Sequence, residues 1–181
     1  MKVYTYNNKV LVNSANDKWL MKAPPPSEVT IGTQVWKNSN LAIDDGQGGI
    51  TIKDGVYYYT LAAAVRVTNS IDGWHIPSYQ EFKTLVNYVG STDTEIILAL
   101  AANSNRWSTP GNDTYGFGML PDGHLRNGDY YNYNDQAMFI CSYNNSVNST
   151  YYFYMNDRVT GINGLVADVS WQYNIRLIKD S

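Results

Sequence analysis

Residues 127–157 limit what this chain can fold into more than any other segment. The window contains seven Tyr and seven Asn but no Lys or Arg. Tyr favours strands, whereas Asn disfavours them. Tyr also offers a broad, rigid contact surface and Asn supplies adaptable hydrogen bonds, which is the mixture found in antibody paratopes. We therefore predict that this segment forms a binding surface, and the alternative is an ordinary Tyr-rich antiparallel sheet.

The composition and charge of the chain limit its partners. The 181 residues carry a net charge of −3 and contain no basic run, so nucleic acid and anionic membranes are poor partners. The single cysteine, Cys141, excludes internal disulfides and a cysteine-built zinc site. The N-terminus lacks the apolar segment of a secretory signal, and no stretch reaches the ~20 apolar residues of a membrane helix. We therefore expect a soluble protein made in the cytoplasm.

The N-terminal 22 residues have the pattern of three short strands, with Asn7-Asn8 as a turn between the first two. This segment is too small to bury a core alone. Three consecutive prolines at 24–26 then form a stiff spacer. We predict an attachment segment at residues 1–22, a linker at 23–28 and the main domain at 29–181. The alternative is that residues 1–22 add an edge to the main sheet.

The middle of the chain has three helix-start signals, and strand patterns lie on both sides of them. Two of the signals are capping boxes, in which a hydroxyl and a glutamate three residues later satisfy each other's backbone donors. The caps are Thr60, Ser78 with Glu81, and Thr92 with Glu95, and the helices should end near Val67, Gly90 and Ala102. Leu61, Ala64 and Val65 should share the buried face of the first. This arrangement predicts an α+β fold, in which the last strand, residues 173–178, neighbours the first, residues 29–31.

Several short motifs occur in a specific order between residues 29 and 180. They are TIGTQVW at 30–36, NL at 40–41, AAA at 62–64, GWHIPS at 73–78, YGFG at 115–118, LPDG at 120–123 and IRLIKD at 175–180. Together they resemble the Fibrobacter succinogenes major paralogous domain. The resemblance implies a C-type-lectin-like fold, with both termini in one sheet and a loop-rich second half that displays a variable surface.

The chain also departs from that family and its relatives. Phe139-Ile140-Cys141-Ser142 stands where the family usually shows Trp-Ser-Ser. The calcium-binding motifs of sugar-binding C-type lectins are absent, so the resemblance implies no calcium-dependent sugar binding. Lone Cys141 does not match the cysteine chemistry of the related formylglycine-generating enzymes. We expect no catalytic site, no metal and no cofactor.

The N-terminal segment and its proline hinge resemble adaptor segments of phage structural proteins. This resemblance implies a virion protein that is made in the host cytoplasm, released by lysis, and bound to other virion proteins through residues 1–22. The Asn/Tyr/Ser/Asp bias is compatible with a protein diversified by a retroelement, because such systems randomise adenine-rich codons. Weak individual contacts would need several copies, as in a homo-oligomer such as a trimeric fibre.

The displayed surface should come from residues 130–157, with a host cell-surface glycan as its ligand and a protein as the alternative. Tyr rings can cover the apolar C–H faces of sugars, and Asn and Asp can pair with hydroxyls. Because Phe153 is the most apolar residue of its strand, we expect Tyr152 and Tyr154 to face outward. The lack of Lys and Arg argues against strongly acidic targets. The candidate ligand-binding residues are Tyr130, Tyr131, Asn132, Tyr133, Asn134, Tyr143, Asn144, Asn145, Asn148, Tyr152, Tyr154, Asn156 and Asp157.

Other residues that could carry chemistry have simpler interpretations. We expect His75 to be structural near the core, His124 to lie in a surface turn, and Cys141 to be a small buried residue rather than a nucleophile. The Asp44-Asp45 loop favours a solvated turn over a calcium site. Three functions remain open: a receptor-binding virion protein, a structural virion decoration protein, and a bacterial surface adhesin or enzyme.

Overall fold

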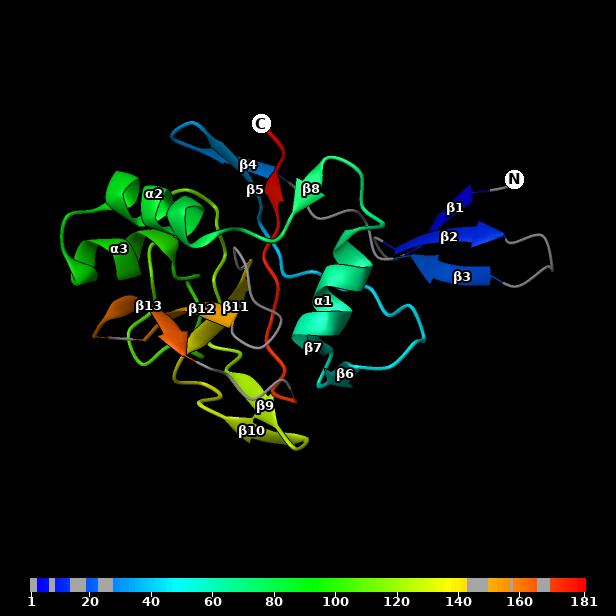
Figure 1. The fold of residues 1–181 in the computed structure, drawn as a ribbon. Helices are drawn as coiled ribbons and strands as arrows, with labels where there is room; N and C mark the ends of the chain where they lie inside the picture. The colour runs from blue at the N-terminus through cyan, green and yellow to red at the C-terminus, as the bar shows by residue number, and fades with distance from the viewer. Residues whose placement is uncertain are drawn as a thin grey trace.

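Three helices and several small antiparallel sheets make up the structure (Figure 1). The computed structural model describes residues 3–6, 9–13, 19–22, 28–142, 150–156, 158–165 and 170–181. Helices and strands are mixed, as the α+β prediction requires. The described helices are all short, and none of them is long and apolar enough to cross a membrane.

The N-terminal strands form a sheet of their own. β1 (Val3–Tyr6), β2 (Lys9–Asn13) and β3 (Trp19–Lys22) pair as an antiparallel meander and with no other described strand. The three short strands are therefore confirmed, and they do not extend the main sheet. Residues 23–27 of the predicted linker lie outside the described residues, and Glu28 already begins the next strand.

The main sheet contains both ends of residues 28–181. Its strands are β4 (Glu28–Ile31), β5 (Gln34–Lys37), β14 (Ile178–Lys179) and β8 (Trp74–His75), in that order. The first and last strands share this sheet, but β5 lies between them rather than leaving them adjacent. The cause is the tight hairpin at Gly32 (φ 61°), which pairs β5 with β4 on one side. The regular final strand is also shorter than expected.

The three helices begin at the predicted caps. They are α1 (Leu61–Thr68), α2 (Tyr79–Val89) and α3 (Asp93–Leu100). The Thr60 cap and both capping boxes are present. The predicted buried face of α1 is partly wrong, because Val65 is exposed while Ala63, Ala64 and Val67 are buried. The small alanines let this face pack closely against the strands, and Val65 points away from it.

The remaining strands form two hairpins and a second sheet. The hairpins are β6 (Ile50–Lys53) with β7 (Val56–Tyr59), and β9 (His124–Arg126) with β10 (Asp129–Tyr131). The sheet has the order β11 (Ala137–Cys141), β12 (Thr150–Met155) and β13 (Thr160–Leu165). Every residue of β11 is buried. A strand of this kind has protein on both faces.

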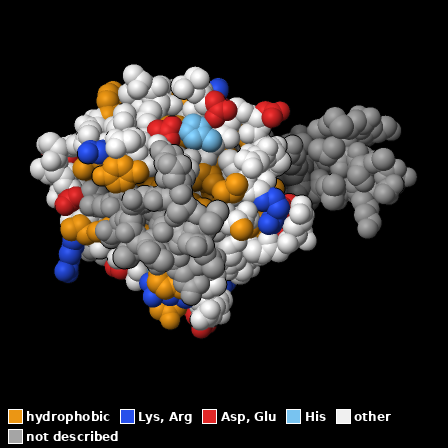
Figure 2. All heavy atoms as spheres, viewed as in Figure 1, with side chains coloured by type: hydrophobic (Ala, Val, Ile, Leu, Met, Phe, Trp, Pro, Cys, Tyr) orange, Lys and Arg blue, Asp and Glu red, His pale blue; other side chains and the backbone are white. Residues whose placement is uncertain are grey.

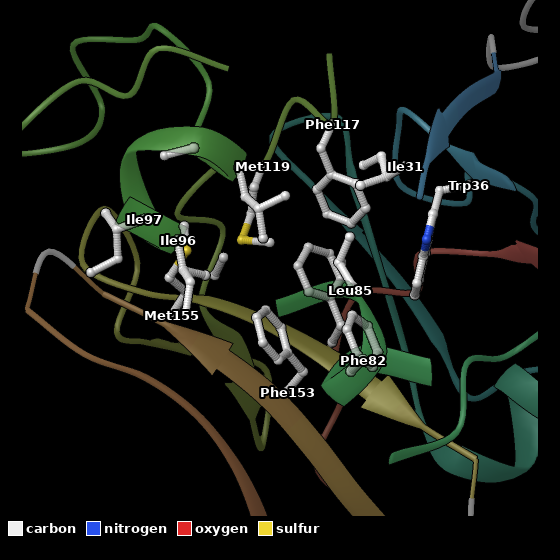
Figure 3. Packing of buried hydrophobic residues seen from close by; sticks show 14 of the residues in the cluster. Ile31, Trp36, Phe82, Leu85, Ile96, Ile97, Phe117, Met119, Phe153 and Met155 are labelled. Carbon is white, nitrogen blue, oxygen red and sulfur yellow. The ribbon is translucent and has the colours of Figure 1, made fainter. Parts of the chain in front are cut away.

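Two hydrophobic clusters lie on opposite faces of β11 and β12. One contains Phe82 of α2 and Phe153 of β12, whose rings stack with centroids 4.6 Å apart (Figure 3). The other contains Tyr152 of β12 and Tyr173 of the C-terminal segment, stacked at 5.6 Å. Because neighbours along β12 alternate between faces, Phe153 and Met155 pack into the first cluster, and Tyr152 and Tyr154 pack into the second.

Candidate functional site

The structure divides the predicted binding residues into three groups. Five of them, Tyr143, Asn144, Asn145, Asn148 and Asp157, lie outside the described residues. Five others lie in β10 or in the turn that follows it: Tyr130, Tyr131, Asn132, Tyr133 and Asn134. The last three, Tyr152, Tyr154 and Asn156, lie on or just after β12. The described candidates therefore belong to two different strands with different surroundings.

The expected exposure of Tyr152 and Tyr154 is wrong. Tyr152 is only 8% exposed and stacks on Tyr173. Tyr154 is half-buried and packs against the same cluster. Phe153 is buried as expected, but on the opposite face. Choosing the more apolar face as the inner one fails here because both faces of β12 are covered.

Among the candidate residues that the structure describes, the accessible tyrosines lie in the β9–β10 hairpin and the turn that follows it. Tyr131 is 43% exposed, and Tyr130 and Tyr133 are half-buried. The rings of Tyr130 and Tyr133 stack with centroids 4.3 Å apart. The Tyr130 hydroxyl donates to an oxygen of Asp54 at 2.7 Å. Because strand neighbours point to opposite faces, Tyr130 and Tyr131 make the two sides of the hairpin aromatic.

Cationic side chains lie over these rings, two from other segments and one from the hairpin itself. The Lys53 ammonium is 4.0 Å from the centroid of Tyr130, and the guanidinium carbon of Arg106 is 4.9 Å from that of Tyr133. On the other side, the guanidinium carbon of Arg126 is 4.5 Å from Tyr131. The absence of Lys and Arg from residues 127–157 therefore does not give a surface free of cations. Figure 2 shows basic and hydrophobic side chains together at the lower edge, where β9 and β10 lie.

Arg106 also ties the hairpin to the buried interior. It donates to Asp122 at 2.7 Å and to the Asn134 side chain at 3.1 Å. Asp122 accepts a further bond from Asn40, which in turn accepts from the fully buried Arg176 at 2.8 Å. A buried network of this kind is stable only when its members are paired, and it fixes their positions. The tyrosine surface therefore stands on a rigid base.

The predicted asparagines shape turns. Asn132 and Asn134 adopt positive φ angles of 56° and 61°, which asparagine tolerates better than most residues. Asn156 accepts backbone bonds from Arg158 and Val159, both at 2.9 Å. These internal roles explain why asparagine is dense beside strands that it would otherwise weaken.

His124 is buried, and its predicted place in a surface turn is wrong. Its ring stacks on that of Tyr173 at 5.2 Å, and its Nε2 accepts from the Arg126 Nε–H at 2.8 Å. Burial, together with the charge of Arg126, lowers the pKa of His124 from 6.5 to about 4. The preceding Gly123 suggests a turn, but Leu125 exchanges backbone hydrogen bonds with Gln172, which places this segment inside.

His75 lies at the surface rather than near the core. Its ring nitrogens are 2.7 Å from Asp180 and 2.8 Å from Glu81. Burial alone would lower the pKa of His75, but these two carboxylates raise it above 6.5. The His75 side chain therefore links the C-terminal segment to the start of α2.

The acidic loop and the cysteine make contacts that suit structural roles. Asp45 forms a two-bond ion pair with Arg66, at 2.6 and 3.0 Å, and this pairing lowers the pKa of Asp45 to about 2. Cys141 is fully buried, and burial raises the pKa of its thiol. Within the described residues, no group of three or more His, Cys, Asp or Glu side chains is arranged to hold a metal ion.

Sequence patterns missed four members of this surface, namely Lys53, Arg106, Arg126 and Trp171. Arg126 lies one residue before the Tyr/Asn window of residues 127–157. Trp171 lies 45 positions after Arg126 in the chain. The guanidinium carbon of Arg126 is 3.6 Å from the Trp171 ring. The only available signal was the His-Leu-Arg alternation leading into the hairpin.

No family model matches the chain, and comparison with curated proteins and with solved structures finds no match.

Proposed function

We propose that this chain is a phage virion protein whose main domain binds a host cell-surface glycan through the β9–β10 hairpin. The proposal rests on the tyrosines of this hairpin, whose rings are ordered by nearby cations. One of these cations, Arg106, is bonded to the buried Asp122. Tyr131 is exposed on one side of the hairpin, and the stacked rings of Tyr130 and Tyr133 lie on the other. Rigid rings of this kind lose little conformational entropy when a ligand binds.

The chemistry of this surface suits a sugar. Tyrosine rings cover apolar C–H faces, while hydroxyl, amide and guanidinium groups at their edges bond to sugar hydroxyls. Lys53, Arg106 and Asn134 supply such groups next to the rings. Because one hairpin offers few contacts, each site binds weakly, and a homo-oligomer such as a trimer would supply the avidity.

Two features of the fold support the lectin-like and virion parts of the proposal. β4 and β14 share one sheet, as expected for a C-type-lectin-like domain with neighbouring ends. Residues 1–22 contribute strands that pair only with each other among those described, which suits a separate segment for attachment to other virion proteins. The domain then acts as a binding module rather than an enzyme.

A glycan array and a host-cell adsorption assay test the proposal. The key variant combines Tyr131→Ala with Tyr133→Ala, and Tyr88→Ala is the matched control because Tyr88 is an exposed tyrosine on α2. We expect the double variant to lose at least about tenfold in affinity, or ~1.4 kcal/mol. The control should bind like the wild type. Unchanged binding by the folded double variant would favour a structural decoration protein instead.

A further inference from the structure

The side chain of Arg126 is held in one orientation by three contacts. Its Nε donates to His124 Nε2 at 2.8 Å. Its guanidinium carbon is 3.6 Å from the Trp171 ring centroid and 4.5 Å from that of Tyr131. Stacking on aromatic rings occupies the flat surface of a guanidinium and leaves the N–H groups at its edge for hydrogen bonds. The side chain is thus ordered before any ligand arrives.

The two terminal nitrogens of Arg126 have no hydrogen-bond or ion-pair partner in the described part of the chain. Asp129 lies directly opposite Arg126 in the hairpin register, but the two side chains form no ion pair. Arg126 is half-buried and Asp129 is exposed. Arg106, which also lies over a tyrosine ring of this surface, is by contrast paired with Asp122. Among the described residues, Arg126 is therefore an ordered cation whose terminal N–H groups have no partner.

The contact with His124 does not neutralise the charge of Arg126. Its Nε2 accepts a proton from Arg126, so the ring is neutral and its own proton is on Nδ1. The buried ring can therefore position Arg126 but cannot balance its charge. A partly desolvated cation gains more from an anionic partner than one that is fully in water.

We propose that the ligand carries a carboxylate, and that the two terminal nitrogens of Arg126 bind its two oxygens. The ligand class is then an acidic sugar with a carboxyl group on its ring, which would lie beside exposed Tyr131 and Trp171. This inference rests on the proposed glycan-binding function. The lack of Lys and Arg in residues 127–157 argued only against strongly acidic targets, and Arg126, just before that window, adds a site for one carboxylate.

A carboxylate suits this site better than a polyanion. The planar fork of one guanidinium matches the two oxygens of a carboxylate in number and spacing. Asp129, on the same hairpin, would repel a ligand of higher charge. Arg126 has no ion-pair partner among the described residues and lies opposite the Asp129 carboxylate, so the site favours an anion with one negative charge.

The direct test uses the wild-type chain and changes the ligand. Binding is measured to carboxylated glycans, to the same glycans after reduction of the carboxyl group to an alcohol, and to sulfated analogues. We expect reduction to weaken binding by about tenfold or more, as for loss of a charge-assisted bidentate pair. Sulfated analogues should bind more weakly than carboxylated ones. Equal binding of sulfated or reduced glycans would overturn the carboxylate assignment.

Two variants add an independent check. Asp129→Asn removes the competing charge without touching the Arg126 contacts and should raise affinity for carboxylated glycans a few-fold. Arg126→Gln should abolish the difference between carboxylated and reduced glycans. If neutral glycans bind and neither variant changes the preference, the carboxylate inference fails while glycan binding stands. If no glycan of any kind binds, the proposed function fails and this inference fails with it.

Discussion

The β9–β10 hairpin and strand β12 contain the same residue types, but they place their tyrosines in opposite environments. Tyr131 of the hairpin is 43% exposed, whereas Tyr152 of β12 is 8% exposed. β12 is the central strand of its sheet, with Phe82 against one face and Tyr173 against the other. The hairpin has only two strands, and the cations over its rings come from strand β6 (Lys53), from Arg106 and from β9 itself (Arg126).

Tyrosine density therefore does not by itself locate a binding surface. In β12 the rings fill two clusters and stabilise the fold. In the hairpin the rings are ordered by cations and remain accessible. Stability measurements on matched variants, followed by a binding titration of the unchanged chain, separate these two roles.

The largest effect should come from truncation of a buried ring. Tyr152→Ala removes a side chain stacked on Tyr173 and should lower the free energy of unfolding by about 3–5 kcal/mol, as for other large-to-small core changes. Tyr131→Ala should cost less than about 1 kcal/mol, because the ring is partly in solvent. Urea denaturation monitored by circular dichroism gives both values. Equal losses for the two variants would remove the distinction between the strands.

Acid should destabilise the region beneath the hairpin through His124. The pKa of His124 falls from 6.5 in the unfolded chain to about 4 in the fold, because burial and Arg126 disfavour its charge. The unfolded state therefore binds more protons between these values, and stability falls as pH drops from 6.5 toward 4. The free energy of unfolding should fall by about 3 kcal/mol across this pH range because of His124.

The matched variant for this effect is His124→Gln, which cannot titrate. The difference in unfolding free energy between wild type and variant should shrink as the pH falls through this window. A difference that stays constant from pH 7 to pH 4 would show that His124 is not buried in the neutral form.

The smallest effect should come from His75, on the main sheet, and it should have the opposite sign. Asp180 and Glu81 raise the pKa of His75 above 6.5, so its stabilisation is complete below pH 6.5 and is lost as pH rises through the folded value. The side chain is partly exposed, which limits the contribution to less than about 1 kcal/mol. Unfolding of His75→Gln at pH 6 and pH 9 measures it. A greater effect of the substitution at pH 9 would contradict this assignment.

Local signals in the sequence predicted much of the fold. Both capping boxes need only residues three apart, so Ser78 with Glu81 and Thr92 with Glu95 could be identified from the sequence. The N-terminal strands follow from short alternating patterns. The buried state of Cys141 follows from its apolar neighbours.

The candidate site depends on contacts that are distant in sequence, and these could not be predicted. Alternation along β12 offers two faces, but only the packed structure shows that both are covered. His124 is buried because Leu125 pairs with Gln172, 47 residues away. Lys53 reaches Tyr130 from another hairpin across 77 positions. The composition of residues 127–157 cannot indicate a cation that lies elsewhere in the sequence.

We propose that the β9–β10 hairpin, and not β12, is the binding surface. Backbone amide shifts recorded by NMR during titration with host-cell glycan test it most directly. We predict that, among the described residues, the largest changes occur at residues 124–134 and at Trp171, while those of β12 stay small. Large changes on β12 with none on the hairpin would contradict the claim.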